Sequence, residues 1–158
     1  ERKRPGPSRR STEISKVTAD SLAPVLDLTK FSYLGVDVYV YITQADAGTR
    51  AAGINAAAMA LADAGMPMKD LITSIAVGKV SDKIVVDLDK DEEDHEDGAT
   101  DLPMAMSTRT GEITLLQMDG NMTQKEIKEA VEMGMKACIE IKKVQVEALK
   151  AKYTEAGK

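Results

Sequence analysis

The residues of this sequence that could act on a phosphate group begin with two adjacent arginines near the start of the chain. Arg9 and Arg10 close a basic, proline-broken segment over residues 1–10. A guanidinium group binds phosphate oxygens through two parallel hydrogen bonds, so neighbouring arginines could serve successive phosphates of one strand. A solvated basic tail is an equally good interpretation of this segment when it is taken alone.

A second phosphate-compatible feature is the glycine–threonine pair at positions 48 and 49. It follows the strand-like run over residues 36–43 and opens an alanine-rich helix. The first N–H groups of a helix are free and carry the positive end of its dipole, so Gly48 and Thr49 predict an anion site. An ordinary N-cap is the alternative, and it is the more common use of such a pair.

The third feature is an acidic segment over residues 87–101, which holds eight carboxylates before Asp101. We expect most of them to be solvated, unless one pair converges on a divalent cation. An EF-hand loop is disfavoured because Glu92 takes the place of its central glycine and Gly98 that of its last glutamate. His95, the only histidine, is either a ligand or base in this loop or simply a solvated side chain.

The composition fits one globular domain. The 158 residues are 43% hydrophobic and 30% charged, with a net charge of −5 that argues against a protein coating nucleic acid over its whole surface. The single cysteine, Cys138, and the absence of a signal peptide or a long apolar run predict a cytoplasmic protein. Because the chain starts at Glu1 within a charged loop, we expect a preceding segment to have been removed or to be absent.

Hydrophobic periodicity and turn residues predict a fold of the α+β class. The long C-terminal helix opens with a capping box at Thr123 and Glu126, and Cys138 lies on its apolar stripe as a buried structural thiol. The predicted helices cover residues 8–23, 49–64, 68–73 and 123–153, and the predicted strands cover residues 25–28, 36–43, 75–80, 83–88, 103–109 and 112–119.

Several of these motifs, in this order, resemble the RNase PH family, and the alanine at position 47 favours its archaeal exosome branch. The similarity runs from the first residue to about Tyr153. The motifs are Pro7-Ser8-Arg9-Arg10, Gln44-Ala45-Asp46-Ala47-Gly48-Thr49-Arg50, Leu61-Ala62-Asp63-Ala64-Gly65-Met66-Pro67, Asp101-Leu102-Pro103 and Leu115-Leu116-Gln117-Met118-Asp119-Gly120.

The resemblance implies helices packed on mixed β-sheets, with the first strands of the fold absent from this chain. It implies a single, N-terminally incomplete domain over residues 1–158, made of a basic loop over 1–10, mixed elements over 11–122 and a C-terminal helix over 123–153. The implied activity is a processive 3′-to-5′ exoribonuclease that uses inorganic phosphate to release nucleoside diphosphates and can run in reverse to tail RNA. The implied partners are single-stranded RNA, related non-catalytic subunits of a hetero-hexameric ring, and RNA-binding cap proteins.

By the same resemblance, Arg10, Gly48 and Thr49 match the phosphate site, and Arg9 and Arg10 contact the RNA. Asp94 matches the catalytic acid, and Asp94 with Asp101 would hold Mg²⁺ or Mn²⁺. The step from Asp94 to Asp101 is one residue longer than the family pattern, so Glu93 is a rival for the acid.

Two other classes of function remain open. A non-catalytic ring or RNA-binding scaffold is favoured by the missing strands but requires no acid pair. A small anion-binding regulator would use only the arginines and the helix start, and would bind phosphate without shortening RNA.

Overall fold

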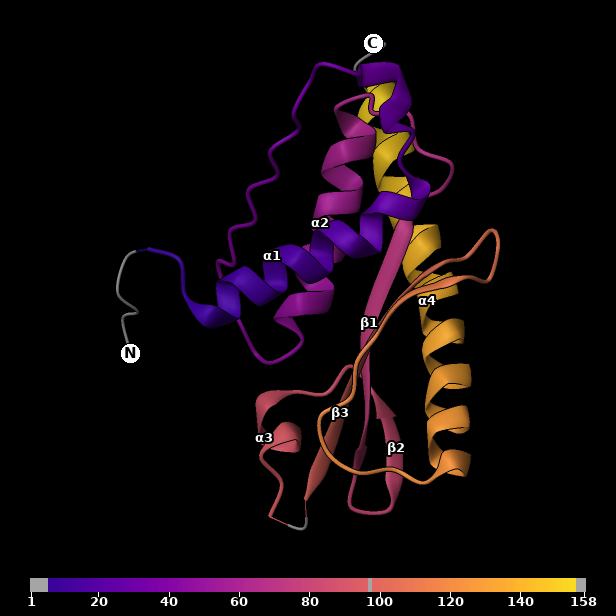
Figure 1. The fold of residues 1–158 in the computed structure, drawn as a ribbon. Coiled ribbons are helices and arrows are strands. Elements are labelled where there is room, and N and C mark those ends of the chain that lie inside the picture. Colours follow the sequence, from indigo (N-terminus) through magenta and orange to yellow (C-terminus); the bar gives the residue numbers. More distant parts are fainter. Residues whose placement is uncertain (1–5, 97, 156–158) are drawn as a thin grey trace.

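The computed structural model describes residues 6–96 and 98–155 (Figure 1). Arg2, Lys3 and Arg4 of the predicted basic loop lie outside these residues, and Arg9 and Arg10 belong to the first turn of a helix rather than to a loop. The elements in chain order are α1 (Arg9–Leu22), two 3₁₀ turns (Ala23–Val25 and Leu28–Phe31), α2 (Thr49–Asp63), β1 (Ile72–Val80), β2 (Lys83–Val86), α3 (Lys90–Glu93), β3 (Ala99–Ser107), β4 (Ile113–Leu116) and α4 (Gln124–Glu155).

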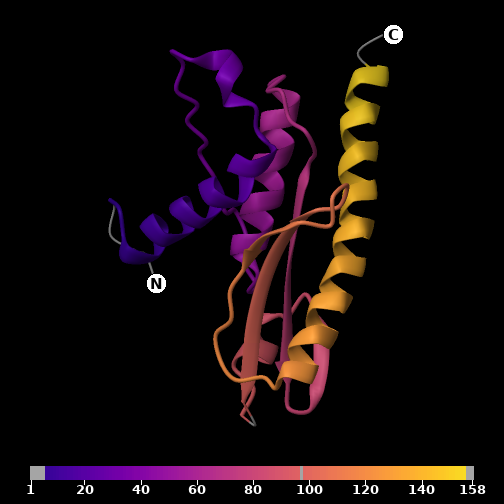
Figure 2. The same ribbon diagram turned by 45° about the vertical axis from the view of Figure 1, so that its right-hand side comes forward.

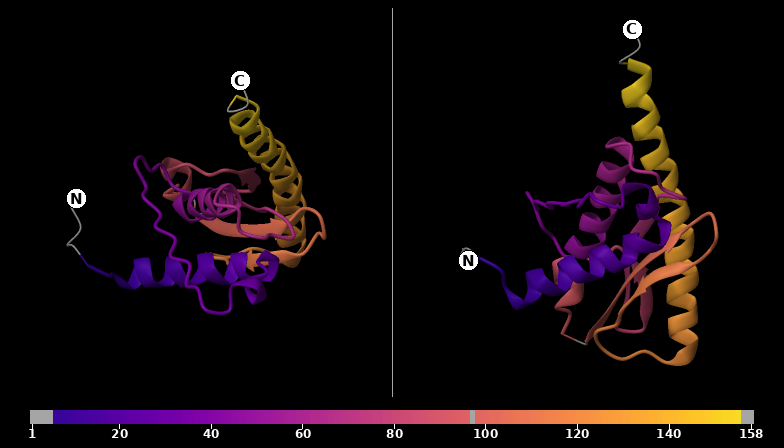
Figure 3. Two further views of the ribbon diagram at one scale, coloured as in Figure 1. Left: turned by 90° about the horizontal axis from the view of Figure 1, so that it is seen from above. Right: turned by 45° about the horizontal axis from the view of Figure 1, so that its top comes forward.

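The four strands form one antiparallel sheet in the order β2-β1-β3-β4. Helix α4 covers one face of this sheet, and α2 packs against the other face (Figure 2). Helix α1 lies across the direction of the strands on the same side as α2 (Figure 3). Among the described residues, no helix is long and apolar enough to cross a bilayer.

Alternation along β3 assigns its side chains to the two layers. Leu102, Met104 and Met106 are buried in the core beneath α4, while Ala105 belongs to the core formed with α2. Because successive side chains of a strand point to opposite faces, Ala99, Asp101 and Pro103 share the face of Ala105. Asp101 therefore lies on the side of the sheet that α1 and α2 border.

Close packing of α4 on the sheet depends on a glycine, which has no side chain at the point of contact. A Cβ at Gly134 would overlap the sulfur of Met104 and come within 2.8 Å of Val77 Cγ2. Thr123 and Glu126 form the predicted capping box at the start of α4: Thr123 N–H donates to Glu126 Oε2, and Glu126 N–H donates to Thr123 Oγ1. Cys138 is fully buried on the predicted stripe.

The edge of β1 that β2 leaves open is completed by a side chain of α2. Strand β2 pairs only with Val77–Val80, so Ser74 has no strand partner on that side. Asn55 replaces the missing strand there: its Nδ2 donates to Ser74 O at 2.7 Å, and Ser74 N–H donates to its Oδ1 at 2.9 Å. These two bonds fix α2, and the residues of its first turn, relative to the sheet.

Both predicted hairpins are present, but β1 begins three residues and β3 four residues earlier than predicted, and β4 ends three residues earlier. The predicted helices over 8–23, 49–64 and 123–153 are present with ends shifted by a residue or two. The predicted strands over 25–28 and 36–43 are wrong. Residues 25–31 form 3₁₀ turns and a single bridge from Leu26 to Met68, and residues 36–43 are irregular. A strand requires a neighbour to complete its hydrogen bonds, and none of the described strands runs beside residues 36–43.

The predicted helix over 68–73 is also wrong. Lys69 N–H donates to Val25 O at 2.7 Å, and β1 begins at Ile72, where it pairs with Ser107 of β3. The tertiary hydrogen bonds override the weak helical preference of this short segment.

Candidate functional site

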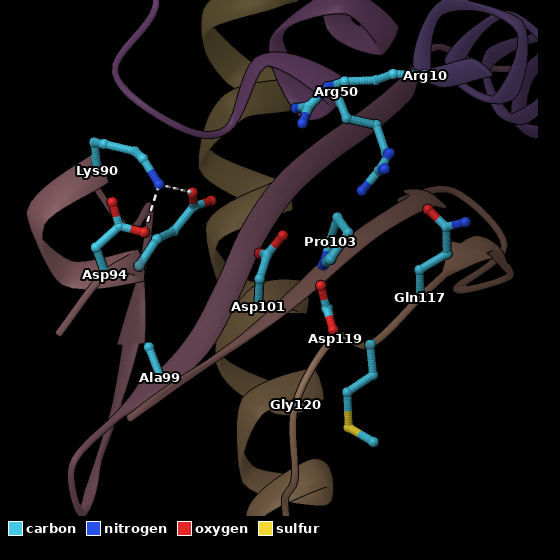
Figure 4. Close-up of a pocket in the computed structure, with 12 residues that line it drawn as sticks. Arg10, Arg50, Lys90, Asp94, Ala99, Asp101, Pro103, Gln117, Asp119 and Gly120 are labelled. Carbon is cyan, nitrogen blue, oxygen red and sulfur yellow. Dashed lines mark hydrogen bonds and ion pairs between the residues drawn. The ribbon is translucent and has the colours of Figure 1, made fainter. Parts of the chain in front are cut away.

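A polar cleft of about 520 Å³ lies on the sheet face that α1 and α2 border. Figure 4 shows the two arginines on one side of this cleft, Asp101 near its centre, and Lys90 and Asp94 toward α3. The lining residues come from α1, α2, α3, β3 and the segment after β4, and they are Arg10, Arg50, Lys90, Glu93, Asp94, Ala99, Asp101, Pro103, Gln117, Met118, Asp119 and Gly120.

The arginines of the cleft come from the first turns of two different helices. Arg10 is exposed in α1, and Arg50 is the second residue of α2. Arg50 Nη2 donates to both carboxylate oxygens of Glu13, at 3.2 and 3.1 Å. Arg50 Nε is buried and has no hydrogen-bond partner among the described residues. The guanidinium group is therefore held in place by Glu13 while its Nε donor has no partner in the described part of the chain.

Asp101 is a half-buried acid of the cleft. Its backbone exchanges two hydrogen bonds with Asp119, Asp101 N–H to Asp119 O at 2.9 Å and Asp119 N–H to Asp101 O at 2.8 Å. Residues paired in this way carry their side chains on the same face. Burial first, and then the negative charges of Glu93 and Asp119, raise the pKa of the Asp101 carboxyl, although Arg50 and Arg10 oppose the shift.

Asp101 Oδ1 is also buried without a partner in the described part of the chain. Gln117 also lines the cleft, and its Oε1 is likewise buried without a partner among the described residues. Buried polar atoms are normally hydrogen-bonded, and an orphaned one in a native structure calls for an explanation. Three such atoms around one cleft, counting Arg50 Nε, indicate a site shaped for a polar ligand.

The acidic segment after β2 is partly helical. Asp89 caps α3 by accepting from Glu92 N–H at 2.9 Å, and Lys90 N–H donates to Asp46 Oδ1 at 3.1 Å, which joins α3 to the turn before α2. Lys90 Nζ lies 2.6 Å from Asp94 Oδ1 and 3.8 Å from Glu93 Oε2. Both rivals for the catalytic acid thus line the cleft, and Lys90 bridges them.

The sequence-predicted site residues separate into two groups. Arg10, Asp94 and Asp101 line the cleft together. Arg9 and Gly48 do not line it, and Thr49 lines an apolar groove beside α1 instead.

The start of α2 still lies close to the acidic segment. Gly48 takes the N-cap position of α2 in the left-handed conformation, at φ 57°, and no side chain caps the helix there. A Cβ on Gly48 would lie 3.8 Å from Asp87 Oδ1. The predicted roles of Arg9, Gly48 and Thr49 stay predictions.

Sequence reasoning gave no role to Arg50, Gln117 or Asp119. Each follows or belongs to a motif already recognised, Arg50 directly after Thr49 and the other two in Gln117-Met118-Asp119-Gly120. A signal was therefore present, since Arg50 is the second residue of a helix whose start was predicted to bind an anion. The partnership of Gln117 with Glu13, across 104 positions of sequence, had no local signal.

The carboxylates of the cleft suit a hard cation in chemical type. Mg²⁺ is usually held by one or two carboxylates together with water and substrate phosphates. The unpartnered Asp101 Oδ1, with Asp119 opposite it, fits that pattern. No group of three or more His, Cys, Asp or Glu side chains in the described ranges is arranged to hold a metal by itself. The cation site at Asp94 and Asp101 stays a prediction.

Comparison with known proteins places this chain in a family. Two sequence models of the 3′ exoribonuclease family match it in succession, RNase PH domain 1 over residues 1–67 and domain 2 over residues 70–137. The chain belongs to the RNase PH family of 3′ exoribonucleases. The resemblance found in the motifs is thereby confirmed.

Relatives in archaea are similar over nearly the whole chain. Exosome complex component Rrp41 of Methanosarcina mazei is 54% identical over 153 residues, which are 97% of this chain and 30% of that protein. The protein of the same name from Thermococcus gammatolerans is 52% identical over 153 residues, 61% of its own length. This chain thus spans less than two thirds of either relative.

The fold is found in a solved structure as well. The crystal structure of rice (Oryza sativa) Rrp46 superposes with a TM-score of 0.74 at 18% identity, covering 92% of this chain and 68% of that one. This similarity confirms the predicted α+β, RNase PH-like fold. In the described residues of this chain, the sheet is antiparallel throughout.

Proposed function

We propose that this RNase PH-family chain shortens RNA from its 3′ end by using inorganic phosphate to release nucleoside diphosphates. The observation that carries the proposal is the cleft itself, in which Arg10 and Arg50 face Asp101 across unpartnered polar atoms. The names of the archaeal relatives support an exosome-like setting. The reaction is phosphorolysis rather than hydrolysis, because phosphate takes the place of water as the attacking group.

The arginines supply the positioning that this reaction needs. Phosphoryl transfer depends on alignment and on stabilisation of charge on oxygen more than on covalent help from the protein. Arg10 and Arg50 would hold the attacking phosphate in line with the last phosphodiester of the RNA. A phosphate oxygen then bonds to that phosphorus, and the bond from phosphorus to the 3′ oxygen of the preceding nucleotide breaks.

The leaving 3′ oxygen must receive a proton to become a hydroxyl. Asp94, the acid implied by the family pattern, already has an ion pair with Lys90 at 2.6 Å. Asp101 has a raised pKa and, among the described residues, an unpartnered oxygen, and both features suit a proton donor. We therefore give Asp101 the role of acid and Asp94 that of its neighbour in the cleft, with Glu93 the remaining rival.

Mg²⁺ or Mn²⁺ would be held by the ionised Asp94 and by substrate oxygens, beside the protonated Asp101, and would neutralise charge on the reacting phosphates. Such a cation would be shared with substrate oxygens, since the cleft supplies few protein ligands of its own. The reverse reaction, at excess nucleoside diphosphate, would add nucleotides to the RNA 3′ end.

The proposed partners rest on the family resemblance rather than on the cleft. We propose single-stranded RNA as substrate, a related non-catalytic subunit as neighbour in a hetero-hexameric ring, RNA-binding cap proteins, and a cytoplasmic location. Aromatic residues make up only 3% of the sequence, so RNA binding should rest on phosphate contacts more than on base stacking. Such binding weakens steeply as salt is raised.

The test is incubation of 5′-labelled RNA with the chain, alone and mixed with the related ring subunit, with and without phosphate. We expect shortening only with phosphate, with nucleoside diphosphates as the released product. Asp101→Asn should abolish it, whereas Asp20→Asn, in an exposed ion pair on α1, should not. Nucleoside monophosphates without added phosphate would refute phosphorolysis, and RNA binding without any shortening would favour the scaffold.

A further inference from the structure

A hydrogen-bond network behind the cleft joins three elements that are far apart in sequence. Glu13 of α1 accepts from Arg50 Nη2 of α2 and from Gln117 Nε2 after β4, the latter at 3.2 Å. The Glu13 side chain is 39% exposed and that of Arg50 is 22% exposed. The bond from Gln117, working against partial burial and aided by Arg50 and Arg10, lowers the pKa of Glu13, so it is ionised at neutral pH.

This network determines which atoms remain for a ligand. Arg50 uses Nη2 on Glu13, and its buried Nε has no partner among the described residues. Because only the amide nitrogen of Gln117 can donate to a carboxylate, the Gln117 oxygen faces elsewhere and is also unpartnered. Glu13 itself does not line the cleft. Its effect on a bound anion must therefore pass through the two residues that it holds.

We infer that Glu13 is a positioning residue, which fixes the Arg50 guanidinium for binding of inorganic phosphate in the cleft. The inference rests on the proposed function for the identity of the anion. An arginine free to change rotamer would have to be ordered at each binding event. Ordering one flexible side chain in advance is worth up to about tenfold in affinity.

A simple charge effect predicts the opposite result, which makes the inference testable. Glu13 is negative and close to an anion site, so its removal would strengthen phosphate binding if it acted only through its field. If Glu13 acts by holding Arg50, its removal weakens binding while Arg50 is present. When Arg50 is absent, only the charge effect remains, and the sign reverses or the effect vanishes.

The experiment is a titration of the full chain with inorganic phosphate, followed by NMR through the backbone amide signal of Gly120 at the cleft. The variants are Glu13→Gln, Glu13→Asp, Arg50→Ala and the double variant Glu13→Gln/Arg50→Ala, with Asp20→Asn as the matched control on the same helix. A well-dispersed amide spectrum shows that each variant is folded. Glu13→Asp keeps the charge but is one methylene too short for the contacts at 3.1 and 3.2 Å.

We expect the dissociation constant for phosphate to rise about tenfold in Glu13→Gln and also to rise in Glu13→Asp. Asp20→Asn should bind as the wild type does, and Glu13→Gln should cause no further weakening in the Arg50→Ala background. Equal weakening by Glu13→Gln in both backgrounds would overturn the inference, because contacting residues that act together are not additive. Wild-type affinity in Glu13→Gln or Glu13→Asp would overturn it as well.

The outcome is separable from the proposed reaction because RNA plays no part in the titration. Phosphate binding with the expected pattern, but no RNA shortening by the assembled protein, would leave the role of Glu13 standing and remove the proposed function. RNA shortening by the assembled protein, with unchanged phosphate binding in the Glu13 variants, would leave the proposed function standing and remove the role of Glu13. Failure of the wild type to shift the Gly120 signal with phosphate would overturn both.

Discussion

Replacing Asp101 by asparagine should stabilise the fold while it abolishes activity. The carboxyl of Asp101 is partly buried, faces the charges of Glu93 and Asp119, and has an oxygen without a partner among the described residues. Its pKa is raised in the folded state, so the folded environment destabilises the ionised carboxylate relative to the unfolded chain. Asparagine has nearly the same shape and no charge, and its NH₂ group can donate to a neighbouring carboxylate.

The size of the effect follows from the unpartnered oxygen. Leaving a buried polar group unsatisfied costs about 1–3 kcal/mol. Asparagine still buries polar atoms at the same place, so we expect a gain near the lower limit, about 1 kcal/mol. In a chain of 158 residues this corresponds to a rise in Tm of about 2–4 °C.

The pH dependence of the gain distinguishes charge from packing. A carboxyl whose folded pKa is raised weakens the fold at a pH above that pKa. The penalty fades as pH falls through the folded pKa, and it is gone below the pKa of the unfolded chain, about 3.9. Thermal unfolding of both proteins should therefore show the largest difference at pH 7.5 and a smaller one at pH 4.5. A variant less stable than the wild type at pH 7.5 would refute the reasoning, because the carboxylate would then be stabilising.

The remaining predictions concern stability and turnover. Asn55→Ala should lower the free energy of unfolding by about 2 kcal/mol in urea, because Ser74 loses both edge partners; an effect below 0.5 kcal/mol would contradict this role. Gly78→Ala should lower the free energy of unfolding by about 1–3 kcal/mol or more, because the new Cβ would overlap the backbone oxygen of Thr100. An unchanged Tm would contradict this close packing. Arg9→Ala and Arg10→Ala should each slow RNA turnover, and only Arg10→Ala should also weaken phosphate binding. Weaker phosphate binding in Arg9→Ala, with wild-type binding in Arg10→Ala, would assign the phosphate contact to Arg9 instead. Asp94→Ala should abolish turnover and leave RNA bound in a filter-binding assay, whereas full activity would show that Asp94 has no part in the reaction.

Much of the fold could be predicted because its signals are local. The turn at Ser81-Asp82, the capping box at Thr123 and the left-handed Gly65 after α2 each depend on residues within a few positions. The errors arose where local preference competed with pairing across the sequence. Residues 36–43 alternate as a strand does, and Val36, Val38, Val40 and Ile42 line one groove, but no described strand supplies their hydrogen bonds.

The site was predictable in its charged residues and less so in its supporting ones. Arg10, Asp94 and Asp101 were placed by motif, and the structure brings them to one cleft. The choice between Asp94 and Asp101 as proton donor required burial and neighbouring charges, which depend on the pairing of Asp101 with Asp119. The roles of Glu13 and Gln117 required a contact between distant segments, which spacing cannot show.

The central claim is that one cleft holds phosphate between Arg10 and Arg50, within reach of Asp101. The most direct measurement is anomalous diffraction from crystals soaked in tungstate, a heavy mimic of phosphate, with a second set of crystals soaked in tungstate and excess phosphate. We expect a tungsten peak in contact with both guanidinium groups, which phosphate displaces. Tungsten bound only elsewhere on the molecule, with this cleft empty, would contradict the claim.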